Sequence, residues 1–437
     1  MIQKDILNFM DENDVKFIKL VFCDLLGVQK SLSVTISQAD KLLSFGLAFD
    51  ASSIIGFSDK SKSDLYLKPD ISTMQLLPWR PSIGRVVRFF CDIINPDGSD
   101  FLFCTRAILR KTVERCENMG FTPHIGMECE FYLFKTDNNG DPTMIPYDEA
   151  CCFDVAPIDK CENVRREMCL TLEEMGIHPE VSHHESGPGQ NEIDFNYRGS
   201  LSGADTLMAF KTTVKAIATK NGCFVSFMPK PFPDKSGSGL HLYLSLLRKG
   251  EDVFFSNDGG FSKLARNFTA GILERSCEMA SFVNSNFNSY QRLGEFEAPL
   301  YVSWSYQNRS QLIRIPSAEC AEGRIELRNP DPSLNPYLAF ALIINAGLDG
   351  IENNVLLGPS VDENLYEADE KITSSLVRLP STLEEALQIS ANSSFINRII
   401  GKDLNSEYTK CKLRELVELE SSPNKDLFIF NQYFKRL

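Results

Sequence analysis

The segment ECEFYLF, at residues 128–134, has the residue pattern on which the predicted architecture rests. Its aromatic and apolar residues favour an extended strand, and a strand places residues i and i+2 on one face. Glu128 and Glu130 therefore point the same way. The same alternation recurs in RIELR (324–328), where three charges share one face, and in HLYLS (241–245). The sequence thus predicts a sheet that carries charged groups in register on one face.

Two interpretations of this charged face stay open at this point. A half-buried antiparallel sheet has a solvated polar face that needs no function. Neighbouring carboxylates, however, raise one another's pKa, and a cation between them removes that cost. With Glu185 and Glu192, which flank the turn Gly187-Pro188-Gly189, the strands supply five carboxylates and one histidine. Such a set suits two hard cations, Mg²⁺ or Mn²⁺, and suits structural zinc poorly.

Four arginines, Arg309, Arg314, Arg324 and Arg328, lie close together within residues 309–328. For any one of these arginines, a position on the protein surface without a specific function is a sufficient explanation. Arg314, however, lies inside the apolar run LIRIP (312–316), and arginines in strands usually bind a planar anion. Two metals with several arginines suit a nucleotide polyphosphate that undergoes phosphoryl transfer. No GxxxxGK[ST] motif occurs, so a P-loop does not hold the phosphates.

Composition narrows the class of protein. The 437 residues are enough for two or three domains. A net charge of −14 disfavours nucleic acid and anionic membranes as partners. The sequence has no apolar run of about 18 residues, the length that a membrane-spanning helix needs. Its first residues do not show the basic region followed by an apolar region that is typical of a signal peptide. Its 13 cysteines form no CxxC pair, which is typical of reduced thiols. We therefore expect a cytoplasmic protein.

Turn signals divide the chain near residue 103, after the loop Asn95-Pro96-Asp97-Gly98. The first unit is predicted to hold a helix over 1–13, two strands around Gly27, a helix from Ser37 and a strand from about Gly84. The second unit alternates helices, which end at Gly120, Gly176 and Gly222, with strands. A helical section over about 383–436 completes it. The predicted strands are 128–134, 191–197, 223–229, 240–247, 310–316 and 323–329.

Over nearly its whole length the sequence resembles the type I glutamine synthetase family. The matching stretches include FDASSI (49–54), HHESGPGQNEIDF (183–195), GSGLHLYLSL (237–246), FEAP (296–299), NRSQLIRIP (308–316) and RIELRNPDPSLNPYLAF (324–340). The resemblance implies an α+β fold. A small β-grasp-like domain would span 1–103, and a catalytic domain with a curved antiparallel sheet and surrounding helices would span 104–437.

The resemblance also implies a role for each matching residue. One metal would be held by Glu130, Glu185 and Glu192, and the other by Glu128, His241 and Glu326. ATP would be bound by Arg309, Arg314 and Arg324, with Ser245 near the adenine. Glutamate would be bound by Arg292, Arg328 and the backbone of Gly237. The residues placed in catalysis are Asp50, which binds ammonium from a neighbouring subunit, Glu297 of a closing flap, and Arg309.

The implied reaction makes γ-glutamyl phosphate from glutamate and ATP, and an amine then displaces the phosphate. Its substrates would be glutamate, ATP and ammonium or a small amine, and its cofactors at least two Mg²⁺ or Mn²⁺ ions per site. The resemblance further implies active sites between subunits and a homododecamer of two hexameric rings.

Departures from the family pattern cluster around the amine pocket. Cys152 stands where a tyrosine is usual, Ser236 replaces an asparagine, Tyr243 replaces a histidine, and the flap over 292–297 is one residue shorter. One interpretation is drift that leaves glutamine synthesis intact. Another is a pocket enlarged for a bulkier amine, which makes a γ-glutamyl amide ligase. A third, an inactive structural or regulatory relative, predicts eroded metal ligands, yet all six are present.

Overall fold

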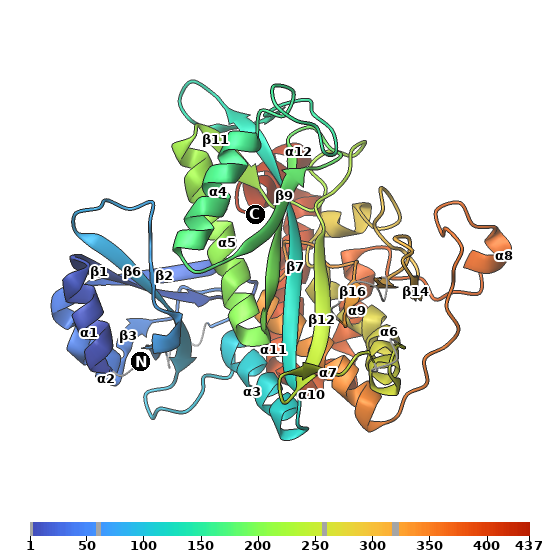
Figure 1. The fold of residues 1–437 in the computed structure, drawn as a ribbon, viewed down its shortest axis with the longest axis horizontal. Coiled ribbons are helices and arrows are strands. Elements are labelled where there is room, and N and C mark those ends of the chain that lie inside the picture. The colour runs from blue at the N-terminus through green and yellow to red at the C-terminus, as the bar shows by residue number, and fades with distance from the viewer. Residues whose placement is uncertain (1–2, 58–62, 256–259, 317–322) are drawn as a thin grey trace.

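The computed structural model describes residues 3–57, 63–255, 260–316 and 323–437. In Figure 1 a small N-terminal domain lies beside a larger body whose long central strands, β7 and β12, run next to each other. No helix in the described ranges combines the length and the apolar character needed to cross a bilayer.

The N-terminal domain is built on a six-stranded sheet with the order β2-β1-β6-β4-β3, and β5 pairs with β6. Its strands are β1 (Val15–Cys23), β2 (Gln29–Thr35), β3 (Leu47–Asp50), β4 (Asp64–Pro69), β5 (Gln75–Leu76) and β6 (Arg85–Ile94). The helices are α1 (Gln3–Glu12) and α2 (Ala39–Phe45). The predicted first helix, the hairpin around Gly27 and the strand after Gly84 are confirmed. The helix expected from Ser37 begins as a single 3₁₀ turn over Ile36–Gln38.

The larger body is built on a ten-stranded sheet with the order β14-β15-β16-β12-β7-β10-β9, and β8, β11 and β13 pair at its sides. Its strands are β7 (Thr122–Thr136), β8 (Pro142–Pro146), β9 (Pro179–His184), β10 (Gln190–Gly199), β11 (Cys223–Ser226), β12 (Leu240–Arg248), β13 (Glu251–Asp252), β14 (Trp304–Tyr306), β15 (Ile313–Ile315) and β16 (Ile325–Leu327). The pairing is antiparallel as expected, except that β14 and β15 run parallel.

Helices surround this sheet, as Figure 1 shows. They are α3 (Thr105–Asn118), α4 (Glu162–Glu174), α5 (Ser200–Lys220), α6 (Lys263–Val283), α7 (Pro336–Glu352), α8 (Glu370–Thr373), α9 (Leu383–Ala391), α10 (Ser394–Ile400), α11 (Lys402–Ser421) and α12 (Lys425–Ile429). The helices predicted to end at Gly120, Gly176 and Gly222 are confirmed.

The sequence patterns did not reveal α6 and α7. Helix α7 is buried on nearly every side, so it lacks the polar stripe that marks a surface helix. It crosses α6 so closely that a β-carbon at Gly271 would lie 2.2 Å from the carbonyl oxygen of Ala346. Close backbone contact, which only glycine permits there, explains how this pair packs.

The charged face of the large sheet is buried, which overturns the solvated interpretation for its central strands. On β16, Ile325 and Leu327 lie in the core, and the opposite face carries Glu326, whose side chain has no exposed surface. Arg328, directly after this strand, is likewise fully buried. Burying an ionised group is costly unless it is paired or binds an ion. Arg328 Nη1 pairs with Glu326 Oε1, so these two buried charges compensate each other in part.

Candidate active site

Strand register places the predicted charged residues opposite one another. Glu128 of β7 pairs with His241 of β12, and Glu130 pairs with Glu192 of β10. On the other side, Glu326 pairs with Tyr243 of β12. Residues directly opposite on an antiparallel pair have neighbouring side chains. Four adjacent strands, β10, β7, β12 and β16, therefore build one continuous charged surface.

One group on this surface consists of Glu128, His241 and Glu326, whose ligand atoms lie within 4.8 Å of one another. His241 Nδ1 is 3.0 Å from Glu128 Oε2 and 3.5 Å from Glu326 Oε1. Burial opposes ionisation of Glu128, but the hydrogen bond and the charge of His241 outweigh it and lower the pKa of this carboxyl to about 2. Two carboxylates and an imidazole on three strands form an open ligand set.

A second group brings Glu185 and Glu192 together with His183, which was not among the predicted ligands. His183 Nε2 lies 3.2 Å from Glu192 Oε1, and its Nδ1 lies 3.4 Å from Glu185 Oε1. Glu130 lies beside this group. Its Oε2 accepts hydrogen bonds from Gln190 Nε2 at 2.7 Å and from the Gly239 amide at 3.1 Å.

The carboxylates of the second group repel one another. Burial raises the pKa of Glu192 well above its usual value, and the charges of Glu130, Glu128 and Glu185 raise it further. Burial and then Glu130 raise the pKa of Glu185. A divalent cation among these oxygens would remove both costs. The oxygen-rich donor set fits Mg²⁺ or Mn²⁺.

The predicted ATP arginines border the first group. Arg314 on β15 pairs with Glu326 and donates to the Tyr243 hydroxyl over 3.3 Å. The guanidinium of Arg324 lies 4.7 Å from the centre of the Tyr243 ring. Arg309 is exposed, and its carbonyl accepts a hydrogen bond from Arg328 Nε at 3.0 Å. Positive charge therefore gathers next to the carboxylates, as binding of a polyphosphate requires.

The predicted glutamate-binding residues surround a cavity of about 230 Å³. It is lined by Glu130, Glu185, Ser186, Gln190, Ser236, Gly237, His241, Arg292, Phe296, Glu297 and Arg328. A β-carbon at Gly237 would lie 2.4 Å from the carbonyl oxygen of Pro229, so only glycine fits at this position. This cavity is large enough for an amino acid.

The predicted flap closes one side of the cavity. Phe296 and Glu297 have φ angles of +46° and +68°, in the left-handed region that non-glycine residues rarely adopt. Arg328 Nη2 donates to the carbonyl oxygen of Glu297 at 3.4 Å. Lys230 Nζ lies 4.5 Å from the centre of the Phe296 ring. These contacts hold a strained backbone over the cavity.

Two further predicted residues, like the predicted ATP arginines, are absent from the lining of this cavity. Asp50 ends β3 in the N-terminal domain, where it is exposed. The backbone amide and the hydroxyl of Ser52 lower its pKa. Ser245 lies buried on β12, opposite His124, and is not among the lining residues. The cavity in one chain therefore contains Glu297 but not Asp50.

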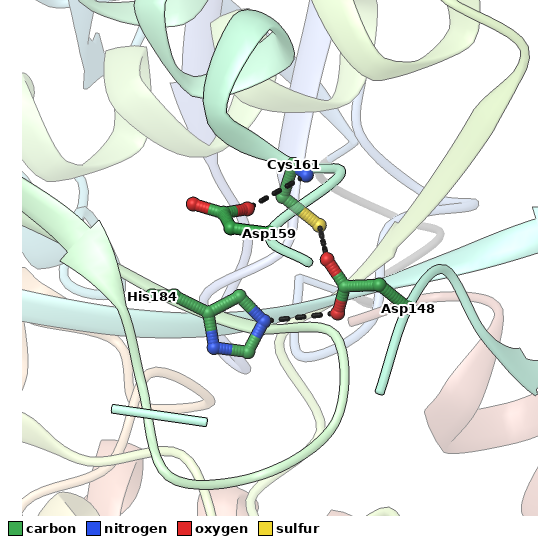
Figure 2. Close-up of side chains that lie close together, drawn as sticks. All are labelled: Asp148, Asp159, Cys161 and His184. Carbon is green, nitrogen blue, oxygen red and sulfur yellow. Dashed lines mark hydrogen bonds and ion pairs between the residues drawn. The ribbon is translucent and has the colours of Figure 1, made fainter. Parts of the chain in front are cut away.

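A buried network of hydrogen bonds adjoins the turn that carries Glu185, and Figure 2 shows the contact between Asp148 and His184 within it. His184 Nδ1 donates to the Glu185 carbonyl at 2.7 Å, and its Nε2 lies 2.9 Å from Asp148 Oδ1. The Gly189 amide donates to the same Asp148 oxygen at 3.0 Å. Burial lowers the pKa of His184, but the Asp148 hydrogen bond outweighs it and raises that pKa. No sequence pattern marked this network, because its members lie 36 residues apart.

Comparison with known proteins agrees with this geometry. Residues 102–429 match the glutamine synthetase catalytic domain, and residues 14–96 match the glutamine synthetase beta-Grasp domain. Glutamine synthetase of Clostridium saccharobutylicum is 43% identical over 418 residues, which cover 94% of each chain. Glutamine synthetase of Staphylococcus aureus strain Mu50 is 41% identical over 416 residues, covering 94% of this chain and 93% of the relative.

Solved structures show the same fold. A ligand-free structure of GmaS superposes with a TM-score of 0.88 at 29% identity, covering 97% of this chain and 98% of that one. The Plasmodium falciparum glutamine synthetase superposes with a TM-score of 0.85 at 25% identity, covering 99% of each chain. Both domains, the order of the motifs and the charged sheet face lead to one conclusion: the chain belongs to the glutamine synthetase family.

Proposed function

We propose that the protein joins glutamate to ammonia to form glutamine and converts ATP to ADP and phosphate in the process. The observation that carries this proposal is the buried charged face of strands β10, β7, β12 and β16. Two groups of oxygen-rich metal ligands lie there beside arginines and beside a cavity of amino-acid size. A fold that serves only as a scaffold has no reason to keep such groups in its core.

The proposed metal ligands are Glu128, His241 and Glu326 for one ion and Glu130, Glu185 and Glu192 for the other, with His183 beside the second. Bound Mg²⁺ or Mn²⁺, at least two ions per site, would neutralise the phosphate charges and this carboxylate cluster. Arg309, Arg314 and Arg324 would stabilise the charge that moves to the leaving ADP. Ser245 would lie near the adenine.

Glutamate would be held by Arg292, Arg328 and the backbone of Gly237. Its side-chain carboxylate attacks the γ-phosphorus of ATP, so that one O–P bond forms and the bond to ADP breaks. The amine nitrogen then attacks the γ-carbonyl carbon, and the C–O bond to phosphate breaks. Asp50 of the partner subunit would take a proton from ammonium before this attack. Glu297 would accept a proton after it and would exclude water by closing the flap.

We propose active sites shared between subunits of a homododecamer of two hexameric rings. The exposed position of Asp50, outside the cavity of its own chain, supports a shared site. Closed rings arise when one surface of a subunit binds a different surface of the next. We also propose a cytoplasmic location, which the free thiols of the described cysteines support.

A γ-glutamyl amide ligase that uses a bulkier amine is the second candidate. Cys152 Sγ lies 4.0 Å from Glu185 Oε1, next to the cavity, and is smaller than the tyrosine usual at this position. The fold is also similar to that of GmaS structures, at 28% and 29% identity, and this similarity is compatible with a larger amine as the substrate. Against it, the two proton-accepting carboxylates, Asp50 and Glu297, are both present and both suit ammonium.

Release of ADP tests the proposal. With ATP, glutamate, ammonium and Mg²⁺ present, ADP and glutamine should form in equal amounts, and omission of any one of these should stop the reaction. Absence of ADP release under these conditions with every amine tried would favour an inactive relative instead. Higher kcat/KM with methylamine or ethylamine than with ammonium would favour the amide ligase.

A further inference from the structure

Tyr243 occupies the junction between the first group of metal ligands and the arginines. It lies on β12 between His241 and Ser245, and its ring is almost fully buried. The hydroxyl hydrogen-bonds Glu128 Oε1 and lies 3.3 Å from Arg314 Nη2. The face of the ring packs against the guanidinium of Arg324. One side chain thus contacts a proposed metal ligand and two proposed ATP-binding residues.

The chemistry of its neighbours fixes how this hydroxyl is oriented. The ionised Glu128 carboxylate can only accept a hydrogen bond, and the Arg314 guanidinium can only donate one. The hydroxyl must therefore donate to Glu128 and accept from Arg314. The other oxygen of Glu128, Oε2, forms a hydrogen bond with His241 Nδ1. Each oxygen of this carboxylate consequently has its own partner, and the plane of the carboxylate is set.

We propose that Tyr243 is a positioning residue, which orients Glu128 toward its metal ion and Arg314 and Arg324 toward the nucleotide phosphates. This inference rests on the proposed function, since it assumes that Glu128 binds metal and that the arginines bind ATP. Groups that hydrogen-bond a metal ligand from outside affect metal affinity by 10–100-fold in other proteins. Through Tyr243, the first metal site and the phosphate site become one connected unit.

A purely structural role for Tyr243 makes a different prediction. The ring alone would fill space against Arg324 and Tyr197, whose ring centre lies 6.4 Å away. Tyr243→Phe keeps that ring and removes only the hydroxyl. If packing were the whole role, Tyr243→Phe would leave metal and nucleotide binding unchanged.

The test compares Tyr243→Phe with the wild-type protein and with Tyr408→Phe. Tyr408 is a matched control, because its buried hydroxyl donates to the Ser281 carbonyl at 2.7 Å between helices α11 and α6, and not on the charged sheet face. Mn²⁺ binding is measured by electron paramagnetic resonance without nucleotide, and KM is measured separately for ATP and glutamate. We expect Tyr243→Phe to weaken one class of Mn²⁺ site by about 10–100-fold and to raise KM for ATP at least about threefold. KM for glutamate should stay within about twofold, and Tyr408→Phe should match the wild type.

Unchanged Mn²⁺ affinity and unchanged KM for ATP in Tyr243→Phe would overturn the inference. A Glu128→Ala variant separates this failure from failure of the proposed function. If Glu128→Ala loses one Mn²⁺ site while Tyr243→Phe keeps both, the metal assignment stands and only the role of Tyr243 is wrong. If Glu128→Ala also keeps both sites, the metal assignment fails and the inference with it.

Discussion

At the scale of single residues, the site is defined by carboxylates placed where they repel. Glu130 and Glu192 lie directly opposite each other on β7 and β10, and Glu185 adds a third charge nearby. Like charges directly opposite on a sheet destabilise it. A divalent cation bound among these oxygens would offset that repulsion.

Replacement of Glu130 by alanine should abolish ligation while the fold is kept. The variant would lose one ligand of the proposed second metal and also the acceptor for Gln190 and the Gly239 amide. We expect kcat/KM to fall by about 10²–10³-fold, as for loss of a group that stabilises the transition state. Circular dichroism should remain unchanged. Glu180→Ala, on an exposed position of β9, serves as the control and should keep full activity. Normal activity of Glu130→Ala would refute the metal assignment.

At the scale of secondary-structure elements, the turn between β9 and β10 carries Glu185 of the second group. The buried pair of Asp148 and His184 holds this turn from behind (Figure 2). The Asp148 carboxylate also accepts hydrogen bonds from the backbone amides of Gly189 and Lys160. Its carboxylate therefore fixes both ends of the segment that carries Glu185.

Asp148→Asn should destabilise the protein and weaken metal binding together. Removing one partner of a buried ion pair costs about 3–5 kcal/mol. Chemical denaturation should show a loss of this order, and Mn²⁺ titration should show weaker binding, because Glu185 is no longer held. Asp137→Asn, in an exposed turn, is the control and should change neither. A destabilised variant with unchanged Mn²⁺ affinity would show that the network does not position the metal ligand.

Helix α5 carries a lysine whose titration should be visible in the stability of the fold. Desolvation and then the charge of Lys211 lower the pKa of Lys215 from 10.5 to about 7. Between these two pKa values the unfolded chain binds the proton more tightly than the folded chain does. Stability should therefore rise with pH from about 7 to about 10, by up to roughly 1.4 kcal/mol per pH unit from this residue.

Comparison with Lys215→Met isolates this contribution, because the variant lacks the titrating group. The free energy of unfolding of the wild type should increase relative to that of the variant as pH rises through this window. A constant difference between the two proteins from pH 7 to pH 10 would show that Lys215 titrates normally.

The sequence predicted the strands of the site well because their charges alternate with core residues. The residue pattern of β16 alone indicates which face is apolar, and Glu128, Glu130, His241 and Arg314 lie on the predicted strands. No strand was predicted over residues 179–184, so the i, i+2 spacing of His183 and Glu185 did not select His183. Helix α7 was missed because uniform burial removes periodicity. Contacts between distant segments, such as that between Asp148 and His184, require the fold itself.

At the scale of the whole molecule, the separation of Asp50 from the cavity is the main feature. The N-terminal domain lies to one side of the body in Figure 1, and β3, which ends at Asp50, belongs to it. A catalytic role for Asp50 therefore requires a second subunit.

Mixed oligomers test this requirement. Asp50→Asn and Glu130→Ala should each be inactive alone. If one subunit supplies Asp50 and its neighbour supplies Glu130, denaturing and refolding an equal mixture should restore about a quarter of wild-type activity, since about a quarter of the interfaces combine two intact halves. Light scattering should show a large oligomer. A fully active monomer, or no recovery in refolded mixtures that form oligomers, would contradict the shared site.

The central claim is that this chain uses ATP to join glutamate to ammonia. The most direct measurement is steady-state kcat/KM for ammonium, methylamine, ethylamine and a polyamine, with glutamate, ATP and Mg²⁺ present and with glutamine and ADP both quantified. We expect glutamine and ADP in equal amounts with ammonium, and the highest kcat/KM for ammonium. A higher kcat/KM for any larger amine, or no ADP release with any of them, would contradict it.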